Sequence, residues 1–329
     1  MQNGSSKLLP QHINWDHDLH ERGELDQSAK LDLDGTLNEI SPTFLDLGRS
    51  HMTNRGAMTI ICSAFAIGWL ALLFLFWEDG LYVSERQWIG GNQTGPMVVM
   101  LRRDFVDTAA LTAIGSIFGG LICFFGFRFD IAPPRDMPIR FNRRMGKVYF
   151  NSYKMNFNPF SKWGPETKVW DWSTVHAEVA RISGFTGKVY QVRYVLILST
   201  CKPGTLEVVD RETVAGPSMT DMEFESMWAY ICKYMAEGKD AVPEQPVRDR
   251  GVYFWRSFFE YAEWIAPTRW GHEARRRSPR GEKIFIVIMS PLLLALLPIS
   301  LPLGIGHFIA MSLAKAQAWP ASIDAESRT

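Results

Sequence analysis

One string in this sequence matches a catalytic motif: Asp32-Leu-Asp34-Gly-Thr36 has the DxDGT spacing of the nucleophile loop of magnesium-dependent phosphatases. In that chemistry the first aspartate attacks phosphorus from the end of a buried parallel strand. The preceding residues, 26–31, are mostly polar and do not form a buried strand, and only about twenty residues separate the motif from the first apolar segment. No α/β domain fits around it, so we predict a turn at Asp34-Gly35 in place of an active site.

Other side chains with metal-binding chemistry lie near the N-terminus. They are His12, Asp16, His17, Asp18 and His20. The polar sequence around them predicts none of the supporting hydrogen bonds that orient metal ligands. We therefore predict no metal site and no cofactor, and we expect a structural role for His307, which lies in an apolar stretch.

Composition argues against several functional classes. The sequence has no GxSxG, HExxH or phosphate-loop motif, and its four cysteines form no CxxC pair. The formal net charge is zero, which is not typical of a general nucleic-acid binder. We predict that the protein is not an enzyme.

Two apolar segments, 57–77 and 108–127, dominate the hydropathy pattern. Each is uncharged over about 20 residues, the length that crosses a hydrocarbon core of about 30 Å. We predict a transmembrane helical hairpin with a short outside loop, 78–107. Gly115 and Gly119 have the GxxxG spacing that lets helices approach closely, with either the first span or a second copy in a homodimer as partner.

Basic residues predict the orientation of these spans. Arginines and lysines cluster in 128–147 and in 275–283, whereas the loop 78–107 has three arginines against five acids. The side richer in arginine and lysine is normally cytoplasmic. We therefore expect a membrane protein with a polar cytoplasmic segment, 1–56, and a cytoplasmic main domain, 128–242.

A third apolar stretch, 284–314, allows two paths. Its roughly 31 residues are too many for one straight span and too few for two. Pro291, Pro298 and Pro302 interrupt it, and each bends or ends a helix. We favour a shallow hairpin that turns near 298–302; the alternative is one kinked span that places the tail, 315–329, outside.

The main domain reads as strands followed by one helix. Alternating or β-branched runs predict strands at 139–142, 147–151, 168–173, 187–200 and 205–209. Thr220 and Glu223 form a capping-box pattern before a helix that ends at Gly238. The predicted fold class is α+β, an antiparallel sheet capped by one C-terminal helix, similar to pleckstrin-homology-like domains.

The linker 243–283 contains an aromatic segment and a basic run. Residues 252–266 predict a helix that lies in the membrane interface, with the arginines on anionic headgroups; the alternative is a helix packed on the domain or on a partner. The candidate lipid-contacting residues are Trp255, Phe258, Phe259, Trp264, Arg275, Arg276 and Arg277.

Several short strings together resemble an uncharacterised bacterial inner-membrane family that is often encoded beside type VI secretion genes. They are Pro138-Ile-Arg-Phe-Asn-Arg143, Gly146-Lys-Val-Tyr149, Val169-Trp-Asp-Trp-Ser173, Tyr234-Met-Ala-Glu-Gly238, Ile309-Ala-Met311 and Trp319-Pro320. The resemblance implies an immunity or accessory protein of a secreted effector. We expect the cytoplasmic domain to bind a protein partner; the alternative function is a lipid-sensing or scaffolding module that recognises anionic lipid.

Overall fold

The computed structural model describes residues 5–22, 30–49, 55–80, 84–88, 97–101, 103–156, 158, 160–185, 190–218, 220–277, 280–316 and 318–328. The chain divides into two compact units, each built from segments that are far apart in the sequence. Unit 1 comprises Met1–His51, Pro134–Arg250 and Ala316–Thr329. Unit 2 comprises Met52–Pro133 and Gly251–Lys315.

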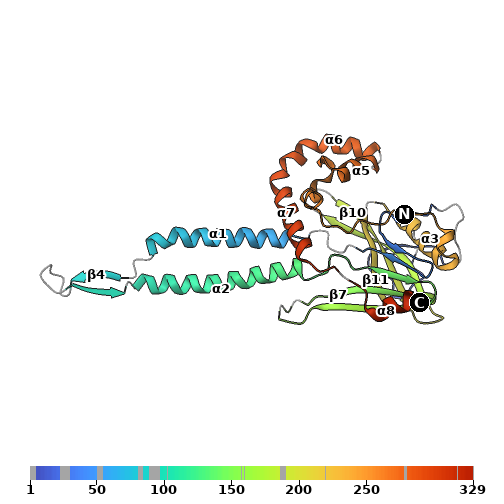
Figure 1. Cartoon of the computed structure of the whole chain (residues 1–329), viewed down its shortest axis with the longest axis horizontal. Helices are drawn as coiled ribbons and strands as arrows, with labels where there is room; N and C mark the ends of the chain where they lie inside the picture. Colours follow the sequence, from blue (N-terminus) through green and yellow to red (C-terminus); the bar gives the residue numbers. More distant parts are fainter. Residues whose placement is uncertain are drawn as a thin grey trace. The chain divides into compact units, whose positions relative to one another are not determined.

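Unit 1 contains two antiparallel sheets (Figure 1). The five-stranded sheet has the order β2 (Leu37–Ile40), β3 (Phe44–Leu47), β6 (Ile139–Asn142), β7 (Lys147–Lys154) and β8 (Gly164–Asp171). The four-stranded sheet has the order β1 (Trp15–Asp18), β9 (Val175–Phe185), β10 (Tyr190–Cys201) and β11 (Val208–Ser218). Apolar side chains of both sheets, such as Phe141 and Leu198, belong to one hydrophobic core.

Helix α3 (Met222–Glu237) packs its apolar face into the same core. The buried residues Phe224, Met227, Trp228 and Ile231 recur at helical spacing, as predicted. Gly238 ends the helix with a φ of 100° and donates its N–H to the Tyr234 carbonyl. The predicted capping box does not form: Asp221 is the N-cap and makes no side-chain capping bond.

The predicted α+β class is confirmed, but the single sheet is wrong. The hairpin of β6 and β7 was expected; β9 and the three strands before residue 50 were not. These three strands have only four residues each, too few to show a period-2 pattern against a polar background. The N-terminal strands β1, β2 and β3 therefore belong to unit 1.

In unit 2, helices α1 (Ala57–Gly80) and α2 (Arg103–Ile131) lie side by side as an antiparallel pair (Figure 1). Strands β4 (Ser84–Trp88) and β5 (Met97–Leu101) pair between them. Ala57–Leu75 and Ala109–Ile131 are long and apolar enough to cross a membrane. Both predicted spans thus correspond to helices of sufficient length.

The rest of unit 2 differs from the sequence-based expectation. Residues 252–266 do not form one helix: α4 (Phe254–Phe258) and a 3-10 segment, η3 (Glu260–Ile265), are broken by a non-helical Ala262. Helix α5 (Arg269–Arg277) follows. Helices α6 (Arg280–Ala295) and α7 (Leu297–Leu313) meet at a 95° bend, so the chain turns before Pro298 and not within 298–302.

Candidate functional site

The phosphatase-like motif forms the predicted turn. Asp34 and Gly35 have φ angles of 47° and 69°, and the Thr36 N–H donates to the Leu33 carbonyl at 3.0 Å. The Asp32 carboxylate accepts the Asp34 N–H at 3.0 Å and pairs with Lys30 at 2.8 Å. Both aspartates are therefore used in closing the turn that leads into β2.

A buried ion pair joins β3 and β6, two neighbouring inner strands of the five-stranded sheet. Arg140 is 1% exposed and donates to both oxygens of Asp46, from Nε at 2.7 Å and from Nη2 at 2.8 Å. Its guanidinium also lies over the rings of Phe44 and Trp319, at 4.1 and 5.0 Å from their centroids. Such a two-pronged, ring-stacked geometry is one that arginine provides and lysine does not.

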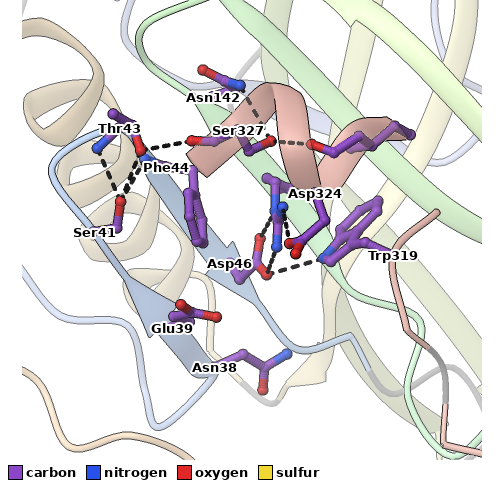
Figure 2. A network of polar contacts seen from close by, with 12 residues as sticks. Asn38, Glu39, Ser41, Thr43, Phe44, Asp46, Asn142, Trp319, Asp324 and Ser327 are labelled. Carbon is purple, nitrogen blue, oxygen red and sulfur yellow. Dashed lines mark hydrogen bonds and ion pairs between the residues drawn. The ribbon is translucent and has the colours of Figure 1, made fainter. Parts of the chain in front are cut away.

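The C-terminal segment completes this cluster. Figure 2 shows Trp319 and Asp324 pointing toward Asp46. The Trp319 Nε1–H donates to Asp46 at 3.0 Å, and the Asp324 carboxylate accepts from Arg140 Nη1 at 2.9 Å. Asp324 belongs to α8 (Ala321–Arg328). The buried positive charge of Arg140 is therefore compensated by carboxylates from two distant segments, β3 and α8.

The pKa values of the two carboxyl groups in this cluster shift in opposite directions. Burial raises the pKa of Asp46, although its hydrogen bonds to Arg140 oppose the shift. The hydrogen bond from Arg140 lowers the pKa of Asp324, which is more exposed to solvent. The ionised Asp324 thus favours the docked position of α8.

An open groove of about 770 Å³ runs beside the edge strand β2. Its lining residues come from β2, α3 and the segment after α3; they are Asn38, Glu39, Ile40, Tyr230, Lys239, Val242, Pro243, Glu244, Gln245, Pro246 and Val247. Arg328 of α8 pairs with Glu39 at 3.2 Å, so the C-terminal segment reaches a lining residue of this groove. Sequence reasoning missed the groove because its two walls lie about 200 residues apart in the chain.

The predicted helix-packing glycines face the first span. A Cβ at Gly115 would lie 2.6 Å from Trp69 Cη2, and one at Gly119 would lie 2.7 Å from Phe65 Cε1. The Trp69 Nε1–H also donates to the Ser116 hydroxyl at 3.0 Å. Of the two partners left open, the structure pairs these glycines with α1 of the same chain.

Three of the four predicted lipid-contacting aromatics form one cluster in unit 2. Trp255 is 59% exposed, whereas Phe258 and Phe259 are half-buried and contact both each other and the Trp255 ring. Trp264 is half-buried on η3.

The predicted basic residues are not equivalent. Arg275 donates to the carbonyls of Trp264 and Ala266, at 2.6 and 3.1 Å, and so closes the end of η3. Arg276 is exposed, and the Arg277 side chain lies outside the described residues. Among the described side chains, Trp255 and Arg276 are the predicted lipid contacts that face solvent.

The N-terminal histidines and aspartates are held by specific bonds. Asp18 accepts from Ser6, from the Lys7 N–H and from the Trp15 indole, all within 2.9 Å. His17 Nδ1 lies 3.0 Å from Asp16, and Asp221 completes a trio whose ligand atoms all lie within 4.8 Å of one another. Half-buried acidic groups meet in this way without an ion, so the trio alone does not make a metal site.

Comparison with known proteins identifies the family. Residues 117–329, about two thirds of the chain, match a family of unknown function, DUF6708. The chain belongs to the DUF6708 family. No curated protein and no solved structure matches it.

The DUF6708 region holds most of the elements described above. It includes the second half of α2, β6–β11, α3 and the chain through α8, and hence Arg140, Trp319 and Asp324. Asp46 and Phe44 precede it, so the buried cluster joins residues inside and outside the matched region. The match confirms a family of unknown function; the bacterial, inner-membrane and secretion associations stay predictions.

Proposed function

We propose that this chain is a non-enzymatic, membrane-anchored protein whose unit 1 binds a protein partner through the groove beside β2. The observation that carries the proposal is the groove itself, which lies along an edge strand and combines apolar, charged and proline residues. Protein segments add to such edges by backbone hydrogen bonds and by side-chain pockets. The fold assignment that accompanies the proposal is pleckstrin-homology-like, from the order of two sheets followed by a helix.

We place the protein in the bacterial inner membrane, with its N-terminus and unit 1 in the cytoplasm. The support is the excess of arginine and lysine after α2 and before α6. The proposed partner is a type VI secretion effector, for which the chain acts as immunity or accessory protein. This assignment follows from the sequence resemblance.

A matched pair of variants tests the groove. Val247 lines it and is 62% exposed, while Val209 on β11 is 63% exposed and lies outside it. Full-length tagged chains carrying Val247→Asp or Val209→Asp are purified from native membranes, and the copurifying proteins are identified by mass spectrometry. We expect one near-stoichiometric partner encoded nearby, lost with Val247→Asp and kept with Val209→Asp. Equal retention by both variants would exclude the groove.

A competition assay tests the biological role separately. Deletion of the gene should either sensitise cells to the neighbouring toxin or block export of the effector. The Val247→Asp chain should fail to restore the phenotype, whereas Val209→Asp should restore it. Absence of any phenotype in both assays would contradict the immunity or accessory role.

A second candidate function is recognition of anionic lipid by the aromatic cluster and α5. The exposed Trp255 ring and the exposed Arg276 favour it, because indole and guanidinium groups suit a headgroup layer. The full chain in nanodiscs with and without phosphatidylglycerol provides the test. Greater shielding of a probe at Trp255 in anionic discs, abolished by Arg276→Gln, supports this function; equal shielding contradicts it.

A further inference from the structure

Unit 1 is closed by buried contacts among its three chain segments. Strand β3 of the first segment pairs with β6 of the second, with Leu45 opposite Phe141. The third segment joins both, because Trp319 donates to Asp46 and Asp324 accepts from Arg140. A further bond links the Thr43 hydroxyl to the Ser327 carbonyl at 2.8 Å.

A bilayer cannot pass between these segments. Bonds of about 3 Å do not form across a hydrocarbon core of about 30 Å, and the buried arginine has its partners only within the assembled unit. All three segments therefore lie on the same side of the membrane. Each connection between them must leave that side and return to it.

Each connection must therefore cross the membrane an even number of times or not at all. Between residues 49 and 134 lie two helices of sufficient length to cross, α1 and α2, which lead out and back. Between residues 250 and 316 the described residues contain one apolar helix pair, Ile286–Leu292 with Leu297–Leu313, bent by 95°. A single crossing there would separate α8 from Arg140, so the pair does not cross the membrane once.

Packing inside unit 2 agrees with this path. A Cβ on Gly56 would clash with the His307 backbone nitrogen, and one on Gly306 would clash with the Gly56 carbonyl oxygen. The middle of α7 therefore contacts Gly56, the residue just before α1 and before the predicted span. Polar contacts lie near the same end of α1: Thr59 donates its N–H and hydroxyl to the buried Asp130 of α2, at 2.7 and 2.8 Å.

We infer that α6 and α7 form a re-entrant elbow that enters the lipid leaflet on the side of unit 1 and leaves on the same side. The exposed apolar side chains that contact lipid include Val287, Ile288, Leu292, Leu294, Leu296 and Ile299. At 1.5 Å per residue, the apolar part of α6 spans roughly 18 Å, close to one leaflet. The inference goes beyond partner binding and does not depend on it.

Labelling from each side of the membrane tests the path. Single cysteines are introduced as Thr205→Cys in unit 1, Ser322→Cys in α8 and Ser84→Cys in β4. Each is exposed to an impermeant maleimide in right-side-out and inverted vesicles, with the parent chain as the baseline for its own cysteines. We expect positions 205 and 322 to react from one side and position 84 from the other. Reaction of position 322 on the side of position 84 would overturn the elbow.

Fluorescence quenching tests contact with lipid. A bimane dye on Leu296→Cys, at the bend, is compared with one on Thr205→Cys in vesicles that contain doxyl lipids. Quenching at position 296 but not at 205 supports insertion. Equal, weak quenching at both positions would show that the bend does not enter the leaflet. Neither result changes the outcome of the groove experiment, so the two proposals can fail separately.

Discussion

Arg140 carries a positive charge in the interior of unit 1, and its neighbours from β3 and α8 compensate it. Removing one member of a buried pair leaves an uncompensated charge, which costs about 3–5 kcal/mol. We therefore expect Arg140→Met to lower the free energy of unfolding by about that amount. Chemical unfolding in detergent provides the measurement.

The double variant Arg140→Met with Asp46→Leu is the control. It removes both charges of the Arg140–Asp46 pair and leaves Asp324 paired with Arg328. Replacing a buried pair by apolar side chains is often nearly neutral. We expect it to recover most of the lost stability. A double variant as unstable as Arg140→Met would mean that packing of the Arg140 stem, and not its charge, holds the cluster together.

Docking of α8 should depend on pH through Asp324. Since Arg140 lowers the pKa of this carboxyl in the folded state, its contribution is full above the unfolded pKa of about 3.9 and is lost as pH falls through the lower, folded value. A spin label on Ser322→Cys should become mobile as this occurs. With Asp324→Asn added, the label should be more mobile already at neutral pH. An immobile label in that variant would contradict the prediction.

At the scale of elements, the packing of α1 against α2 predicts unequal effects of neighbouring glycines. A Cβ at Gly119 meets Phe65, whereas one at Gly120 has no atom within 4 Å. Gly119→Ile should therefore destabilise the hairpin by about 1–3 kcal/mol through overpacking. Gly120→Ile, which makes the same change in helix propensity, should have a much smaller effect on the thermal stability in detergent. Equal loss in both would argue against this pairing of helices.

How far the sequence predicts these elements depends on how local their signals are. Helix α3 follows from apolar residues at a spacing of three and four, and α1 and α2 from uncharged length. Strand β3 could not be predicted, because its four residues are ordered by β6, which lies more than 90 residues later. In the sequence, Arg140 alternates with apolar neighbours, and this pattern predicts an exposed side chain. Its burial could not be predicted because its partners, Asp46 and Trp319, come from opposite ends of the chain.

At the scale of the whole molecule, unit 1 should survive a cut in its connection. We expect a chain cleaved at a protease site inserted within 89–96 to stay associated, since β3 and β6 join the two fragments. Copurification of the untagged fragment in mild detergent is the measurement, and separation in a denaturing detergent is the control. Fragments that part in mild detergent would contradict a unit 1 assembled across the membrane hairpin.

Because unit 1 is built from three chain segments, its strands are translated well before the partners with which they pair. At about 5–20 residues per second, a ribosome needs roughly 5–19 s to go from Asp46 to Arg140 and roughly 14–55 s to reach Trp319. During that interval the hairpin α1–α2 must enter the bilayer while β2 and β3 have no β6 beside them. The nascent N-terminal strands are thus candidates for chaperone protection until translation supplies their partners.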